Sequence, residues 1–341
     1  GTVPVQGVSS ASDLFDQTFQ LNADFDVAKF ASDFPELITL QDGITLESGK
    51  ISLTSFGRTE GNTKRIFLDV RAGQWRATNG AKTIEWTDPI SLAIALRQNQ
   101  IDNQRTDIEL EYIKCESEFL TLNGSGKLDE GQGNIRGNLG VLKAKLAQFI
   151  ELGDFDLDGR IDGSVNWGVA NGFGNTGENQ VIQLAGKIDL NNLSYAMSGL
   201  PRLTEPHSSF QFASKYRLRD YLPDELSQLS MMTSVDTDFL KVELREPTPF
   251  RDDYRFVFDS QVQGNAEAWM KRASSFADLY GLKVEGMANA SAVVFLTPQT
   301  IRVRTTKTPS IKPFNLQLSE VVLQEPVIRG KVDLTYDFIT G

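Results

Sequence analysis

An acidic stretch in the middle of the chain carries the densest set of side chains that could bind a metal ion. Asp154, Asp156, Asp158 and Asp162 stand at positions 1, 3, 5 and 9 of this stretch, with Gly159 at position 6 and Ile161 at position 8. Ca²⁺ takes about six to eight oxygen ligands, and carboxylates spaced in this way around a glycine are typical of loops that wrap it. The stretch is therefore a candidate calcium site.

Two features of the sequence favour a structural interpretation of the same acids. The stretch resembles the calcium loops of EF-hand and dockerin modules, which normally end with a bidentate Glu at position 12, but Val165 stands there and cannot ligate. A second copy of the region, GLKVEGMANASA, has lost the acids and kept the apolar spacing. We therefore predict a turn or strand edge that carries acidic side chains and no metal site, and we keep calcium as the alternative.

The more reactive residue types offer little for catalysis. His207 is the single histidine, and no nucleophile elbow or Gly-rich oxyanion loop accompanies it. Cys115 is the single cysteine, so neither an intrachain disulfide nor a cysteine-based zinc site can form. Acidic pairs such as Asp252/Asp253 could serve a glycosidase, but such pairs are usually solvated. We predict no enzyme and no cofactor, and we rank an enzyme acting on polysaccharide last.

The amino-acid composition limits the classes of partner that the chain can bind. The chain has 341 residues, and 40% of them are hydrophobic, including 21 Phe, which is typical of a folded protein. Its formal net charge is −11. Nucleic acid is disfavoured as a partner, because no basic stripe is available to neutralise phosphates. No apolar run reaches the roughly 20 residues that a membrane-spanning helix needs.

Internal repetition organises the chain around residues 137–167. At an offset of 127 residues, Gly137 and Phe149 recur as Gly264 and Phe276. A weaker copy lies 115 residues upstream, where Phe34 matches Phe149. Because self-similarity at a fixed offset is the signature of a repeat architecture, we predict three related units. Their predicted bounds are 21–130, 131–256 and 257–341 (partial), after an irregular entry or cut edge at 1–20, all in one continuous elongated array.

Hydrophobic periodicity supplies the elements of each unit. Apolar residues recur at helical spacing over 27–37, 142–150 and 269–277, and a period of two residues follows each of these segments. The period of two also favours strands over 44–53, 66–70, 90–96, 108–122, 155–165, 182–190 and 332–338, with a turn at Gly49. A helix is predicted over 222–232 and a loop over 169–180. Long alternating strands with short turns indicate an antiparallel sheet.

The order of these elements resembles the AsmA-like and TamB-like repeat proteins of bacterial envelopes. The segments that show the resemblance are AKLAQFIELGDFDLDGRIDGSV, its second copy KRASSFADLYGLKVEGMANASA, and predicted strands such as VIQLAGKIDLNNLSYAM and VIRGKVDLTYDF. The resemblance implies a mainly β fold with a few short amphipathic helices, in which a long curved antiparallel sheet forms a hydrophobic groove. It also implies a location in the periplasm or cell envelope, with the full-length protein anchored to the inner membrane.

The expected function follows from this resemblance. It is a non-catalytic, groove-like segment that shields phospholipid acyl chains during lipid transport or outer-membrane assembly, with the remainder of a longer membrane-anchored chain as its partner. Candidates for the lipid groove or core are Phe34, Leu142, Phe149, Trp269 and Phe276. The alternative is a structural or adhesion module of a secreted or envelope protein, calcium-stabilised at 154–162.

Overall fold

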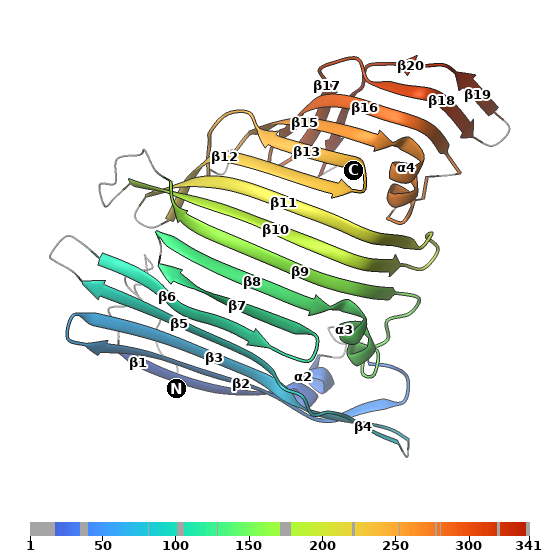
Figure 1. Cartoon of the computed structure of the whole chain (residues 1–341). Helices are drawn as coiled ribbons and strands as arrows, with labels where there is room; N and C mark the ends of the chain where they lie inside the picture. The colour runs from blue at the N-terminus through green and yellow to red at the C-terminus, as the bar shows by residue number, and fades with distance from the viewer. Residues whose placement is uncertain are drawn as a thin grey trace. The chain divides into compact units, whose positions relative to one another are not determined.

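The computed structural model describes residues 18–34, 40–80, 82–100, 106–127, 129–170, 179–219, 222–251, 253–276, 278–279, 281–318 and 321–338. These residues form two compact units (Figure 1). The N-terminal unit comprises Gly1–Gly153 and Arg160–Gln180, and the C-terminal unit comprises Asp154–Gly159 and Val181–Gly341. The predicted fold class is confirmed, because the described residues form mainly antiparallel strands with three short helices. The bounds of the three repeat units stay a prediction.

Antiparallel pairing links the strands of the N-terminal unit into one sheet. The pairs run β1–β2, β2–β3, β3–β5, β5–β6, β6–β7, β7–β8 and β8–β9, and β4 pairs with β3. The bounds are β1 Phe19–Asp26, β2 Ile44–Glu60, β3 Thr63–Asn79, β4 Lys82–Trp86, β5 Ile90–Gln100, β6 Thr106–Glu116, β7 Leu120–Lys127, β8 Glu130–Asn138 and β9 Asp156–Val169.

The C-terminal unit is built in the same way. Its antiparallel pairs include β11–β12, β12–β13, β13–β15, β15–β16, β16–β17, β16–β18, β17–β21 and β18–β19. The bounds are β10 Asn179–Ala196, β11 Leu203–Arg219, β12 Leu222–Val235, β13 Asp238–Leu244, β14 Thr248–Pro249, β15 Phe256–Asn265, β16 Lys283–Leu296, β17 Thr300–Thr305, β18 Ser310–Leu318, β19 Val321–Glu325, β20 Ile328–Arg329 and β21 Asp333–Asp337.

Each of the three helices continues directly from a strand through a side-chain cap. The helices are α2 Val27–Asp33, α3 Leu139–Leu146 and α4 Ala266–Ser274. Their N-caps are Asp26, Asn138 and Asn265, whose side-chain oxygens accept hydrogen bonds from backbone amides of the first turn at 2.9–3.3 Å. Asp and Asn are favoured caps because they satisfy amides that have no partner inside the helix. The repeated strand–cap–helix unit confirms the three predicted helices.

The caps show that the first copy is out of register with the other two. Phe149 and Phe276 stand at the same distance after their caps, and each donates its backbone amide to the carbonyl three residues earlier. Phe34 is instead the C-cap of the shorter helix α2, so it is not their structural equivalent. The predicted helices were also too long at their C-terminal ends, since α3 stops at Leu146 and α2 at Asp33.

The helix predicted over 222–232 is wrong, because these residues form strand β12. Leu226 and Leu229 are three residues apart, which imitates a helical face. In the sheet, Lys215 lies opposite Gln228 and Tyr216 lies opposite Leu226, so that Ser227 is an extra residue. This β-bulge returns both leucines to one face of the strand. The turn predicted at Gly49 is also wrong, because β2 continues through it with register shifts.

Polar contacts tie α4 and β1 to their sheets. Arg272 donates to Glu205 at 2.7 Å and to Asp238 at 2.8 Å, and all three side chains are at least 85% buried. On the edge strand β1, Asp24 accepts from Ser52 at 2.8 Å and pairs with Lys50 at 3.1 Å. The hydrogen bond from Ser52 is the main reason that the pKa of Asp24 is lowered, and the Lys50 ammonium contributes further.

Candidate functional site

Strand register places the apolar residues of the N-terminal unit on one face of its sheet. Directly opposite residues of antiparallel strands share a face, and alternate residues of one strand do too. Leu68 lies opposite Ile94, and Ile94 lies opposite Ile113. The neighbouring row crosses eight strands, from β1 to β9, through Ala23, Leu53, Val70, Leu92, Cys115, Leu122, Ile135 and Gly163. The sequence alternation has thus become a continuous surface, which we call the apolar face.

The apolar face is not covered by a second layer within the part of the chain that the structure describes. Leu68, Ile94 and Ile113, near its centre, are each half-buried, as are Leu53, Val70, Leu92, Leu122 and Ile135. At the β1 edge, Leu21 and Phe25 are 45% and 43% exposed. Core residues that are packed on both sides are normally almost fully buried, so the half-burial of this face indicates neighbours within the sheet and no packed second layer among the described residues. Burial still raises the pKa of the Cys115 thiol, as an apolar setting would.

The opposite face of the same strands is mainly polar, although one row across it, Phe56, Phe67, Ala95 and Tyr112, is aromatic and apolar. Asp69, Ala93 and Lys114 form the row next to Leu68, Ile94 and Ile113 and point away from them. Ion pairs cross this polar face, such as Lys127–Asp107 at 3.0 Å and Arg65–Glu111 at 3.3 Å. The Asp107 carboxylate raises the pKa of Lys127 by accepting its hydrogen bond. Charged and polar side chains therefore predominate on this polar face, whereas aliphatic side chains predominate on the apolar face.

One end of the apolar face is closed by a packed core. Phe149 is 3% exposed and its ring lies 5.9 Å from Trp75 and 6.1 Å from Trp86, with Ile44 and Ala77 completing the cluster. Ile90, on the apolar face of β5, packs against this cluster. Figure 1 shows α2 and α3 at this end of the N-terminal unit, beside β4.

Lys145 ties α3 to this closed end. Its ammonium bonds to Glu118 at 2.6 Å and lies 5.9 Å from the Trp86 ring. The Glu118 carboxylate holds the pKa of Lys145 above its ordinary range. A cation held between a carboxylate and an aromatic ring stabilises the packing of this helix against the core.

The C-terminal unit carries an apolar face of its own. One row runs through Leu244, Phe258, Val294, Val303 and Leu334, on strands β13, β15, β16, β17 and β21. Leu334 is 64% exposed and its neighbour on β21, Tyr336, is 54% exposed. Among the described residues, both units therefore present aliphatic and aromatic side chains to whatever lies outside the sheet.

The candidate groove or core residues fall into different settings. Phe149 is core, and Leu142 is half-buried in α3. Trp269 is half-buried in α4 with the Arg272 guanidinium 5.0 Å from its ring. Phe34 and Phe276 are 45% and 60% exposed. From the sequence, the residues of the apolar faces could be predicted only as an alternation of apolar and polar positions. The pairing register of the strands brings these residues together in rows.

The acidic stretch forms strand and turn contacts. Asp156 begins β9, Asp158 and Asp162 lie within it, and an extended strand does not wrap an ion as a calcium loop does. Asp154 accepts from Ser198 at 2.9 Å, Asp156 bonds to Arg202, and Asp162 pairs with Arg136 at 3.7 Å. No group of three or more potential metal ligands is found among the described residues.

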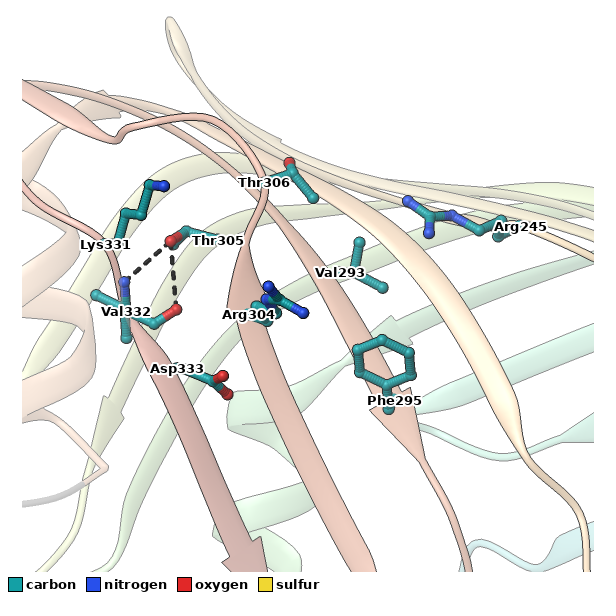
Figure 2. A pocket seen from close by; sticks show the side chains of 9 residues that line it. All are labelled: Arg245, Val293, Phe295, Arg304, Thr305, Thr306, Lys331, Val332 and Asp333. Atoms are coloured by element: carbon teal, nitrogen blue, oxygen red, sulfur yellow. Dashed lines mark hydrogen bonds between the residues drawn. The ribbon is translucent and has the colours of Figure 1, made fainter.

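A hollow of about 540 Å³ lies in the C-terminal unit, on the face opposite its apolar rows (Figure 2). Sequence reasoning missed it, although Arg302 and Arg304 alternate in the RVRTTK segment and so indicate a basic strand face. Its lining residues come from β16, from β17 and the residue after it, from the residue after β13 and from the entry to β21, and they are Arg245, Val293, Phe295, Arg304, Thr305, Thr306, Lys331, Val332 and Asp333.

No helix in the described part of the chain is long and apolar enough to cross a membrane. Comparisons of the chain with protein-family models, with curated proteins and with solved structures each return no match.

Proposed function

We propose that this chain is a non-catalytic carrier segment that holds phospholipid acyl chains against the apolar face of its sheet. The observation that carries the proposal is the row structure of the N-terminal unit, in which aliphatic side chains continue from strand to strand and stay half-buried. Exposed apolar patches larger than a few hundred Å² mark interaction sites on soluble proteins. Acyl chains fit this surface because it offers methyl and methylene contacts and no fixed polar partner.

The energetics suit a ligand that slides as well as binds. Each methylene buried is worth about 0.8 kcal/mol, so roughly ten buried methylenes gain about 8 kcal/mol before ordering costs are subtracted. The gain does not depend on direction and is spread along rows that continue from strand to strand. A lipid could therefore pass from one strand to the next without crossing a large barrier, whereas a site with a few strong hydrogen bonds would hold it in one place.

The polar face and the family resemblance complete the proposed role. Ion pairs on the opposite face suit that side to water, so the apolar face is the side better suited to lipid. The resemblance to AsmA-like and TamB-like proteins supports placing this segment in the cell envelope, as part of a longer chain anchored to the inner membrane. The role requires no catalytic residue and no cofactor.

The test compares two triple variants on the same three strands. Leu68→Gln/Ile94→Gln/Ile113→Gln places polar amides in the central row of the apolar face. Asp69→Gln/Ala93→Gln/Lys114→Gln makes the adjacent changes on the polar face and leaves the net charge unchanged. Bound phospholipid is measured by native mass spectrometry and lipid extraction after purification. Binding of a phospholipid with a fluorescent acyl chain gives an affinity.

We expect the apolar-face variant to lose most bound lipid and the polar-face variant to retain it. Circular dichroism and thermal melting establish that both variants are folded. The proposal fails if the wild-type protein neither co-purifies with phospholipid nor binds the fluorescent probe. It also fails if the two folded variants bind as well as each other.

A further inference from the structure

The hollow in the C-terminal unit has the chemistry of an anion site. Register places Arg304 in a row with Val293 and Asp333, and Arg245 in a row with Val257 and Phe295. The side chains of both rows point to the face of the sheet opposite Phe258 and Val294. In Figure 2, Lys331 and Arg245 lie on either side of Arg304, above Val293 and Phe295. Three cations thus border one hollow with an apolar floor.

Two of these cations form no direct ion pair among the described residues, although the pKa of Asp333, which lies opposite Arg304, is lowered first by its hydrogen bond from Arg302 and further by the Arg304 charge. Arg245 is neutralised by Asp259, which accepts from its Nε at 3.1 Å and its Nη2 at 2.5 Å. Asp333 is held in the same way by Arg302, at 2.8 and 2.7 Å. Within the described part of the chain, Arg304 and Lys331 form no ion pair. The lining therefore keeps an excess of about two positive charges in a protein whose net charge is −11.

Two positive charges match a phosphate monoester, which carries about −1.5 to −2 at neutral pH. Arginine and lysine are the usual donors to phosphate oxygens, and such charge-assisted bonds are stronger than neutral ones. The Nη1 group of Arg245 lies outside its bond to Asp259 and remains free to donate. Val293 is 4% exposed, and this apolar floor strengthens the attraction by keeping water from one side of the ligand.

We propose that this hollow binds a phosphate monoester group, through Arg304 and Lys331 with Arg245 assisting. The ligand could be a free phosphate ester or the headgroup of a phosphatidic-acid type of lipid, because both present the same group. The site is independent of the proposed acyl-chain function, since it lies in the C-terminal unit, on the face opposite the apolar row of that unit. Loss of one activity therefore leaves the other in place.

The experiment measures binding of three probes to the whole chain by isothermal titration calorimetry. The probes are inorganic phosphate, glycerol 3-phosphate and a short-chain phosphatidic acid. The test variant is Arg304→Gln/Lys331→Gln. Its control is Lys271→Gln/Lys283→Gln, which removes the same charge from exposed positions of the same unit outside the hollow.

We expect the test variant to bind glycerol 3-phosphate at least about tenfold more weakly than the wild type and the control to bind within about twofold. If the short-chain phosphatidic acid binds more tightly than glycerol 3-phosphate, the ligand is a lipid headgroup. If the two bind equally, the site recognises the phosphate group alone. The proposal is overturned if the wild type binds none of the probes, or if the two variants lose affinity equally.

Discussion

Phe149 and Phe276 provide an internal comparison that tests the packing argument. They occupy the same position in two copies of the repeat, yet Phe149 is 3% exposed and Phe276 is 60% exposed. The perturbation is the same in each case, truncation to Ala. The side chain removed and the local backbone turn are therefore matched, and the only large difference is what surrounds the ring.

The expected losses of stability follow from these surroundings. Removing the Phe149 ring leaves a cavity between Trp75 and Trp86, and buried Phe→Ala changes cost about 3–5 kcal/mol. Phe276 stacks on Tyr195 at 5.4 Å but keeps most of its surface in solvent. Full burial of such a side chain is worth about 1.5–3 kcal/mol, so Phe276→Ala should cost only about 1 kcal/mol.

Urea denaturation followed by tryptophan fluorescence measures both changes. Trp75 and Trp86 report on the Phe149 cluster, and Trp269 reports on the C-terminal unit. The two units could unfold in separate transitions, so each transition is fitted by itself. Equal costs for the two substitutions, or a cost below about 1 kcal/mol for Phe149→Ala, would refute the view that this cluster closes the sheet.

Three further predictions concern single positions. Arg272→Met should destabilise the protein by about 3–5 kcal/mol in a denaturation curve, because it leaves two buried carboxylates unpaired, whereas Arg219→Met at an exposed ion pair should cost about 1 kcal/mol or less. Asp24→Asn should lower the melting temperature at pH 7. Because the folded pKa of Asp24 is lowered, its contribution is complete above the unfolded pKa of about 4 and is lost as the pH falls through the lower folded pKa, so wild type and variant should converge in acid. Gly286→Ala should lower the melting temperature well beyond Gly281→Ala. Both glycines have positive φ, but only at Gly286 would the new methyl group collide with a backbone oxygen, 1.8 Å away.

Local signals in the sequence were strong enough to predict most elements. The alternation in β5 and β9 predicted strands, and the predicted helices overlap α2, α3 and α4, although α3 and α4 each begin three residues earlier than predicted. Strand β12 was not predicted, because its two leucines share a face only through the bulge at Ser227. A bulge depends on the partner strand, which the local sequence does not show. The loop predicted over 169–180 falls mostly on residues 171–178, outside the described residues.

What the sequence by itself determined is the two-sided character of the strands and the capped entry to each helix. Both depend on neighbours within a few residues, as with Asn138 and the amide of Val141. The tertiary structure decided what each face meets. Equivalent residues of a repeat became core at Phe149 and surface at Phe276, because burial depends on which distant strands and aromatic rings arrive there. For the same reason, only the register of the assembled sheet could show that the apolar rows are continuous and uncovered among the described residues.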